Sequence, residues 1–267
     1  MGFGWINPKE YSFNSLLLFE RFQIRYLFHP ERDAKWRRRM GIALNANPAV
    51  IWYLKRRCPE RADVIAQIAT EAPAEATARS IYKAEVFVLE HAEDFTIYTT
   101  PGVMAQQCDF IRGWSKERLF SLADFTGKTV LDVGAGSGRL TFAAAEKAAW
   151  VYASEPVGTL REFMREKIAE ESIQNVRVLD GFVTALPFPN SMFDIVMSGH
   201  VLGDDWDSEL AEIARVCKPG GWLLNCPGDS ERNLKPKPAL TSRGWEEIHY
   251  VGSYGKDVYI HRRQVIK

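Results

Sequence analysis

The chain has 267 residues, which suits one α/β domain of about 150 residues with an additional segment. Hydrophobic residues make up 46% and charged residues 25% of the chain, a composition typical of globular proteins and not of disordered ones. The 34 basic side chains balance the 34 acidic ones, so no global field favours nucleic acid or an anionic membrane as a partner.

The cysteine spacing predicts free thiols. The sequence contains no C-x-x-C pair and no histidines at metal-site intervals, which indicates neither a zinc site nor a disulfide framework. We therefore expect a cytoplasmic protein without a metal. Residues 13–28 are apolar, but charged residues interrupt them, and the segment is too short to span a bilayer and does not resemble a signal peptide.

Residues 1–100 predict a domain made only of helices, which we describe as a helical cap. Proline and capping residues mark the helix starts, and His29-Pro30 marks an end, because proline disfavours the α conformation in the residue before it. The apolar face of the first helix either packs within the cap or forms a homodimer contact. The predicted helices cover residues 14–28, 33–44, 47–57, 59–70 and 73–89.

Two basic clusters lie in this part of the chain. They are either solvated helix faces or contacts for RNA phosphates. Their members are Arg37, Arg38, Arg39, Lys55, Arg56 and Arg57.

A loop signal at residues 99–102 places the domain boundary between residues 100 and 101. Beyond Gly127, apolar runs alternate with helical stretches, which predicts a mostly parallel sheet with helices on both faces. Near the C-terminus, residues 245–251 and 257–261 flank a loop with two glycines, a pattern typical of a hairpin.

The most informative stretch is Val130-Leu-Asp-Val-Gly-Ala-Gly-Ser-Gly138, which predicts a strand, a glycine-rich turn and then a helix. Glycines let a turn bend sharply and allow a ligand to approach the backbone. The spacing G-x-G-x-G differs from the G-x-G-x-x-G of dinucleotide-binding folds. A second apolar run ends on Glu155, where a carboxylate can accept hydrogen bonds from both hydroxyls of a ribose.

Together with Ala185-Leu-Pro-Phe-Pro189, Phe193-Asp-Ile-Val196 and Lys218-Pro-Gly-Gly221, these motifs resemble those of class I S-adenosylmethionine-dependent methyltransferases. The resemblance covers residues 105–265 and leaves residues 1–100 unplaced. It implies a Rossmann-like, seven-stranded, mostly parallel sheet with a C-terminal antiparallel hairpin in residues 101–267. It also implies S-adenosylmethionine as the cofactor.

The resemblance implies a cofactor site at the carboxyl ends of the strands. Glu155 would hold the ribose hydroxyls, and the glycine turn would pass under the ribose and methionine. Asp132 would order the turn or reach the methionine ammonium through water, unless it only caps backbone N–H groups. The implied cofactor-binding residues are Asp132, Gly134, Ala135, Gly136, Gly138, Glu155, Pro156, Gly181, Phe182, Val183 and Ser198.

The adenine region departs from the family pattern. Members carry Gly-Asp where this chain has Gly181-Phe182, and Asp180 stands two positions too early. Either Phe182 stacks on the adenine while the Val183 N–H meets a ring nitrogen, or a bulge restores Asp180 to the carboxylate role.

His200 and Tyr98 are the candidate catalytic residues. His200 follows the fourth strand, where a histidine acts either as a base or as a hydrogen-bonding wall residue. Tyr98 either closes the site and shapes the acceptor pocket or is buried between domains. The neighbouring Asp204, Asp205 and Asp207 either cap a helix starting near Trp206 or bind a cationic group.

These observations favour a methyltransferase that acts on a small molecule, with the methyl group transferred in line from the sulfonium to the acceptor. Ser198-Gly-His-Val201 stands where amino-methylating enzymes of the family carry an Asn-Pro-Pro-Tyr-like sequence. Two alternatives stay open: an RNA methyltransferase that uses the basic clusters, and a regulatory module that binds the cofactor without turnover.

Overall fold

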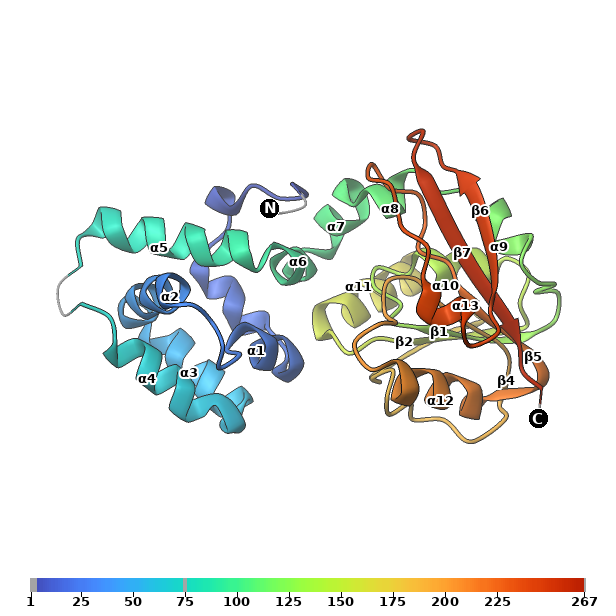
Figure 1. The fold of residues 1–267 in the computed structure, drawn as a ribbon, viewed down its shortest axis with the longest axis horizontal. Coiled ribbons are helices and arrows are strands. Elements are labelled where there is room, and N and C mark those ends of the chain that lie inside the picture. The colour runs from blue at the N-terminus through green and yellow to red at the C-terminus, as the bar shows by residue number, and fades with distance from the viewer. Residues whose placement is uncertain (1–3, 74–75, 267) are drawn as a thin grey trace. The chain divides into compact units, whose positions relative to one another are not determined.

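A computed structural model describes residues 4–73 and 76–266 of the chain. The chain divides into two compact units, Met1–Met104 and Ala105–Lys267 (Figure 1). The loop signal in the sequence predicts this division between residues 100 and 101. Each unit is described by itself below.

The described part of the N-terminal unit is built from helices. Asp33 accepts a hydrogen bond from the Trp36 N–H at 2.8 Å and so caps the second helix. Pro48 occupies the first position of the third, where its missing N–H costs nothing. The α-helices are α1 (Arg21–Leu27), α2 (Ala34–Ala46), α3 (Pro48–Arg57), α4 (Ala62–Thr70), α5 (Ala78–His91), α6 (Glu93–Thr96) and the start of α7 (Pro101–Gln107).

Three helix predictions differ from the structure. The helix predicted over residues 59–70 is divided into a 3-10 helix, Pro59–Arg61, and α4. The continuous helix predicted over residues 14–28 is divided into a 3-10 helix, Phe13–Leu18, and α1. Glu20 and Gln23 form a reciprocal capping box that starts α1, and this interaction is the reason for the division. The predicted helix over 73–89 begins later, because Thr77 caps it through the Ser80 N–H; residues 74–75 lie outside the described residues.

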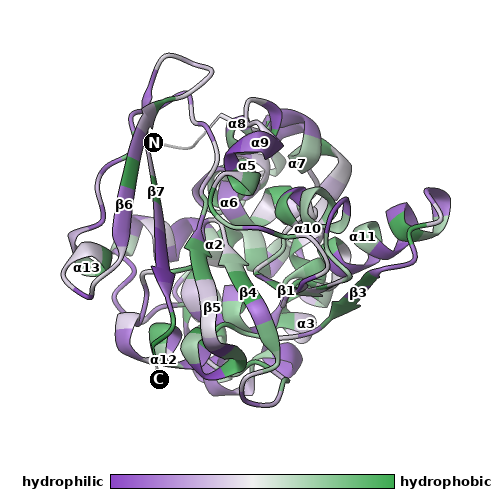
Figure 2. Ribbon diagram, turned by 90° about the vertical axis from the view of Figure 1, so that its right-hand side faces the viewer, coloured by the Kyte–Doolittle hydropathy of each residue, from purple (hydrophilic) through white to green (hydrophobic). Residues whose placement is uncertain are grey.

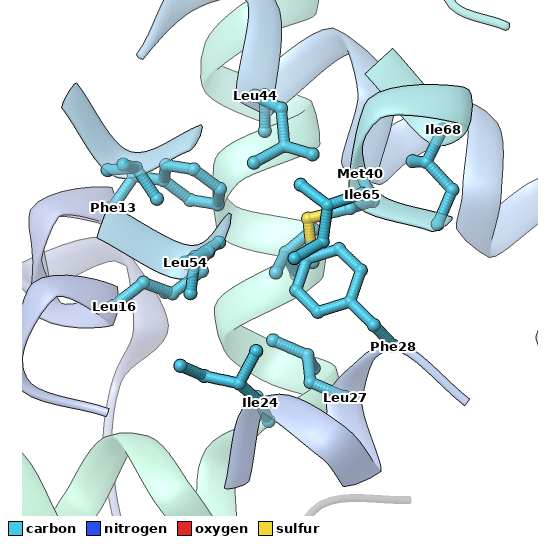
Figure 3. Close-up of a cluster of buried hydrophobic side chains, with 14 of the residues drawn as sticks. Phe13, Leu16, Ile24, Leu27, Phe28, Met40, Leu44, Leu54, Ile65 and Ile68 are labelled. Carbon is cyan, nitrogen blue, oxygen red and sulfur yellow. The ribbon is translucent and has the colours of Figure 1, made fainter. Parts of the chain in front are cut away.

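The N-terminal unit has its own hydrophobic core (Figure 3). Side chains from the 3-10 helix Phe13–Leu18 and from α1 to α5 are completely or almost completely buried in this core. Figure 3 shows Phe28, Met40 and Ile65 converging in this core, which burial of apolar surface stabilises. The labelled members are Phe13, Leu16, Ile24, Leu27, Phe28, Met40, Leu44, Leu54, Ile65 and Ile68.

The basic clusters are partly engaged in ion pairs. Arg37 pairs with Glu71 at 2.6 Å, and Arg57 pairs with Glu20. These pairs fit the interpretation of solvated helix faces better than that of phosphate contacts. Among the described residues, no helix is long and apolar enough to cross a membrane.

The C-terminal unit contains one seven-stranded sheet in the order β3-β2-β1-β4-β5-β7-β6. The first five strands in that order pair in parallel, and β7 pairs antiparallel with both β5 and β6. The predicted Rossmann-like fold with a C-terminal hairpin is confirmed. The elements are α8 (Asp109–Arg112), α9 (Lys116–Phe120), β1 (Thr129–Val133), α10 (Arg139–Ala145), β2 (Trp150–Ser154), α11 (Gly158–Glu170), β3 (Val176–Leu179), β4 (Phe193–Ser198), α12 (Trp206–Val216), β5 (Cys217–Asn225), α13 (Pro238–Thr241), β6 (Glu246–Val251) and β7 (Asp257–Gln264).

Apolar side chains cover both faces of the sheet. Leu140 of α10 and Leu119 of α9 pack on one face, whereas Leu210 of α12 and Leu240 of α13 pack on the other. In Figure 2, β4 and β5 carry more green than the antiparallel pair β6 and β7. Central parallel strands are buried on both faces, which explains their apolar runs in the sequence.

We predict that Leu54→Ala lowers the free energy of local opening of the N-terminal unit by about 2–5 kcal/mol, because it leaves a cavity in the core. Leu54 has no exposed surface. Hydrogen exchange of the amides of α2 to α4 measures this change. Leu18, which is 48% exposed, provides the control: Leu18→Ala changes the same quantity by less than about 0.5 kcal/mol. Equal effects of the two substitutions would contradict the assignment of this core.

Candidate cofactor and acceptor site

The predicted site residues of the C-terminal unit gather where parallel strands end. Gly134 follows β1, Glu155 follows β2, Gly181 comes shortly after β3, and Ser198 is the last residue of β4. Neighbouring parallel strands end at the same edge, and the register aligns Val133 with both Ser154 and Ser198. Ligands of open α/β sheets bind at this edge.

The glycine turn between β1 and α10 depends on left-handed backbone conformations. Gly134, Gly136 and Gly138 have φ values of 64°, 59° and 90°. At Gly134 a second constraint applies, because a Cβ atom there would lie 2.2 Å from Cγ2 of Val201. The turn after β1 and the loop after β4 are therefore packed against each other. Ala135 is buried, and its N–H donates to the Ser154 carbonyl at 3.2 Å.

Glu155 connects the glycine turn to the start of α11. One carboxylate oxygen accepts from the Gly136 N–H at 2.8 Å, and the other accepts from the Val157 N–H at 2.9 Å. Pro156 lies between these two contacts. Burial, with the charge of Asp132 as a lesser cause, raises the pKa of Glu155 to about 7, although both backbone N–H groups oppose this shift.

Asp132, the fourth residue of β1, is buried below the turn. Its carboxylate accepts a hydrogen bond from the Thr141 hydroxyl at 2.7 Å and so ties the strand to α10. Burial raises the pKa of Asp132 to about 7, although Thr141 and Arg139 both favour the ionised form.

The segment after β3 contains Gly181, Phe182 and Val183. A Cβ atom on Gly181 would lie 2.2 Å from the Ser154 hydroxyl oxygen, so a glycine is required there. Phe182 is 42% exposed, whereas Val183 is buried. Asp180 forms an ion pair with Arg161 at 3.3 Å, and its side chain is 75% exposed.

His200 lies one residue beyond Gly199 in the loop after β4. Its ring packs against Phe110 with centroids 4.5 Å apart, while the residue still has an exposed surface. Desolvation by the surrounding protein atoms, followed by the charge of Arg139, lowers the pKa of His200 to about 4. The imidazole is therefore neutral at pH 7 and can accept a hydrogen bond.

Sequence reasoning assigned no role to Arg139, the first residue of α10. Its guanidinium donates to the Cys226 carbonyl at 2.7 Å and lies 4.5 Å from the Trp114 ring centroid. Burial lowers its pKa. The sequence did contain a sign that Arg139 is special, because it is the one charged residue in the helical stretch 139–145, which begins immediately after the third glycine.

The acidic residues after His200 have structural contacts. Asp205 caps α12 by accepting from the Ser208 N–H at 3.3 Å, as its position predicted. Asp207 pairs with Arg243 at 2.8 Å. The buried Glu209 accepts from the N–H groups of residues 203–205 and so holds this loop on α12.

Tyr98 belongs to the N-terminal unit, where it lies in the 3-10 helix Ile97–Thr99 beside the Phe95 ring, 6.5 Å between centroids. Its role at the site remains a prediction. The same holds for the binding roles of the residues in the C-terminal unit, which the structure does bring to one edge of the sheet.

Comparison with known proteins agrees with this geometry. Residues 130–221 match the family model described as a methyltransferase domain. A structure of a SAM-dependent methyltransferase from Aquifex aeolicus superposes with a TM-score of 0.51 at 22% identity, covering 62% of this chain and 98% of that one. The C-terminal unit thus contains a methyltransferase domain and has the fold of a class I S-adenosylmethionine-dependent methyltransferase.

Two curated relatives match part of the chain. The demethylmenaquinone methyltransferase of Lactococcus lactis is 34% identical over 116 residues, 42% of this chain and 46% of the relative. The enzyme of the same name from Listeria monocytogenes is 31% identical over 140 residues, 51% of this chain and 55% of the relative. The chain thus spans about half the length of the curated relatives it matches.

We predict that Gly134→Ala destabilises the methyltransferase domain by about 2–5 kcal/mol, since it combines backbone strain with a clash against Val201. Thermal unfolding measures the effect. Gly244→Ala is the matched control: Gly244 has φ 79° but no atom within 4 Å of its hypothetical Cβ, so only the strain of about 1–2 kcal/mol applies. In a Val201→Ala background the cost of Gly134→Ala decreases. An unchanged cost in that background would refute the proposed clash.

We predict that the affinity for S-adenosylhomocysteine decreases as the pH falls below about 7. In the predicted role of Glu155 the ribose hydroxyls donate to its ionised carboxylate, so protonation of this group would compete with binding, by up to about tenfold per pH unit. In the free protein the sign is opposite: the raised pKa contributes stability below pH 4.5, and this contribution is lost as the pH rises through about 7. Titration calorimetry from about pH 5.5 to about pH 8, a range that brackets this pKa, measures the affinity. Glu155→Gln flattens the profile; an equally steep profile in that variant would assign the titration to another group.

Proposed function

We propose that the chain is a methyltransferase that transfers a methyl group from S-adenosylmethionine to a small-molecule acceptor. The observation that carries the proposal is the Glu155 carboxylate, buried at the end of β2 and hydrogen-bonded to the glycine turn of a methyltransferase domain. The cofactor supplies an electrophilic methyl group on its sulfonium. The chain's residues have to bind it, orient the acceptor and exclude water.

The residues at the sheet edge suit this cofactor. A carboxylate oxygen has about two acceptor sites, and each oxygen of Glu155 uses one of them on a backbone N–H. One site on each oxygen therefore remains for the two ribose hydroxyls. The adjacent Ser154 hydroxyl is buried and has no hydrogen-bond partner among the described residues, so it offers a further polar contact.

For the adenine we favour Phe182. Its ring is exposed and able to stack on a purine, and the Val183 N–H follows it directly. Asp180 is engaged by Arg161, which also donates to the Glu155 carbonyl at 2.7 Å. This ion pair opposes the alternative in which Asp180 binds the adenine amino group.

The acceptor side is formed by the loop after β4. A neutral His200 accepts a hydrogen bond, but a pKa of about 4 makes it a weak base. We therefore infer that His200 orients the acceptor rather than removing a proton from it. Tyr98 is retained as a candidate for closing the site.

A small-molecule acceptor is supported by the relatives named demethylmenaquinone methyltransferase. We propose a compound of comparable size for this chain and a cytoplasmic location for the reaction. The basic residues Arg37 and Arg57 are paired with carboxylates, and no observation favours RNA over a small molecule.

Titration calorimetry with S-adenosylmethionine and S-adenosylhomocysteine tests the proposal. We expect the wild-type protein to bind both, Glu155→Ala to lose at least about 1–3 kcal/mol of binding free energy, and Phe182→Ala to lose more than Asp180→Ala. Circular dichroism of each variant establishes that it is folded. Absence of binding to the wild-type protein would refute the proposal, and a greater loss in Asp180→Ala would reverse the adenine assignment.

A further inference from the structure

A row of polar side chains crosses four strands of the sheet beside the candidate site. The pairing register aligns Ser198 of β4 with Asn225 of β5, Asn225 with His261 of β7, and His261 with Glu247 of β6. Side chains aligned in this way lie on one face of a sheet, next to their neighbours. Ser198 and Asn225 are the last residues of their strands, so the row begins at the edge that holds the glycine turn.

Three members of this row are almost completely buried: Ser198 is 2% exposed, and Asn225 and His261 are 0% exposed. The Ser198 hydroxyl, both polar atoms of the Asn225 amide and Nδ1 of His261 have no hydrogen-bond partner among the described residues. Each unsatisfied buried polar group costs about 1–3 kcal/mol. Four such atoms in consecutive register positions are difficult to explain by packing alone.

Glu247 determines which nitrogen of His261 is protonated. Nε2 lies 3.0 Å from a Glu247 carboxylate oxygen, which can only accept, so Nε2 carries the hydrogen and donates. Burial lowers the pKa of His261, which keeps the ring neutral. Nδ1 therefore presents a lone pair and requires a donor.

Lys237 adds a positive charge near this row. Its charge contributes to lowering the pKa of both His200 and His261. Its ammonium group lies 3.5 Å from the Leu202 carbonyl oxygen and 5.8 Å from the Trp206 ring centroid. Leu202, Leu240 and Trp245 are buried members of the hydrophobic cluster on this side of the sheet.

These groups together define a ligand. Nδ1 of His261 needs a hydrogen donor, while the Asn225 amide N–H and the Ser198 hydroxyl can each donate to an oxygen. One hydroxyl group can donate its hydrogen to Nδ1 and accept from these two donors, and the buried apolar side chains nearby favour an aromatic ring behind it.

We propose that Ser198, Asn225 and His261, with Glu247 as the positioning residue of His261, form a subsite for the hydroxyl of a phenol-type acceptor. The subsite rests on the proposed function, because it specifies the acceptor of the same site. His261 accepts a hydrogen bond from the hydroxyl, and Asn225 and Ser198 donate to its oxygen.

Binding of naphthol, compared with its methyl ether, tests the subsite in the 267-residue chain, with and without S-adenosylhomocysteine. The methyl ether keeps the ring and the oxygen but cannot donate. We expect the wild-type protein to bind naphthol at least tenfold more tightly than the ether. We also expect the nitrogen resonance of His261 Nδ1 to shift when naphthol is added.

Asn225→Leu and His261→Phe should each reduce naphthol binding at least tenfold. Asn225→Leu removes an unpaired amide, so the melting temperature of this variant should be no lower than that of the wild-type protein. A normal melting temperature separates loss of the subsite from loss of the fold. His249→Phe is the control, because His249 lies on β6, pairs with the exposed Asp257 at 2.9 Å and is outside the row.

Equal binding of naphthol and its ether, or undiminished naphthol binding by both row variants, would overturn the proposal and assign the row a structural role. Calorimetry with S-adenosylhomocysteine on the same samples keeps the two hypotheses apart. A wild-type protein that binds naphthol as expected but does not bind S-adenosylhomocysteine would refute the proposed function without refuting the subsite.

Discussion

The edge of the sheet where the parallel strands end depends on the two backbone hydrogen bonds to Glu155. They join the turn after β1 to the loop that starts α11, and they involve a carboxylate that burial would otherwise protonate near neutral pH. A buried carboxylate is stable only when it is hydrogen-bonded or neutral. The same group therefore shapes the glycine turn in the free protein and, in the proposed function, offers acceptor sites for a ribose. Local folding and the proposed cofactor recognition then share one side chain.

The glycine turn shows how one loop limits another. Gly134 is needed for its left-handed conformation and also because Val201 occupies the space of a Cβ atom. Val201 immediately follows His200, so the glycine turn and the loop after β4, which we propose to bind the cofactor and the acceptor, are in direct contact. A close contact of this kind transmits small displacements, because packed interiors are not compressible.

Much of the fold could be predicted from the sequence, since the relevant signals are local. Apolar runs, glycines and prolines gave the strands, the hairpin and the helices beginning at Ala34 and Pro48. The division of the first helix was missed, because the capping box of Glu20 and Gln23 lies within a continuous apolar stretch and competes with the helix periodicity. At the site, the glycines and Glu155 were recognisable by their spacing. The row of Ser198, Asn225 and His261 was not, because its members are joined only by strand register, and register depends on pairing between distant segments.

The N-terminal unit has a core composed of its own side chains, from Phe13 to Ala92. A segment that buries its apolar surface internally does not depend on the sequence of another domain for its folding. Substitutions inside this core therefore act first on the packing of the N-terminal helices, whereas the glycine turn and Glu155 depend on contacts within residues 105–266.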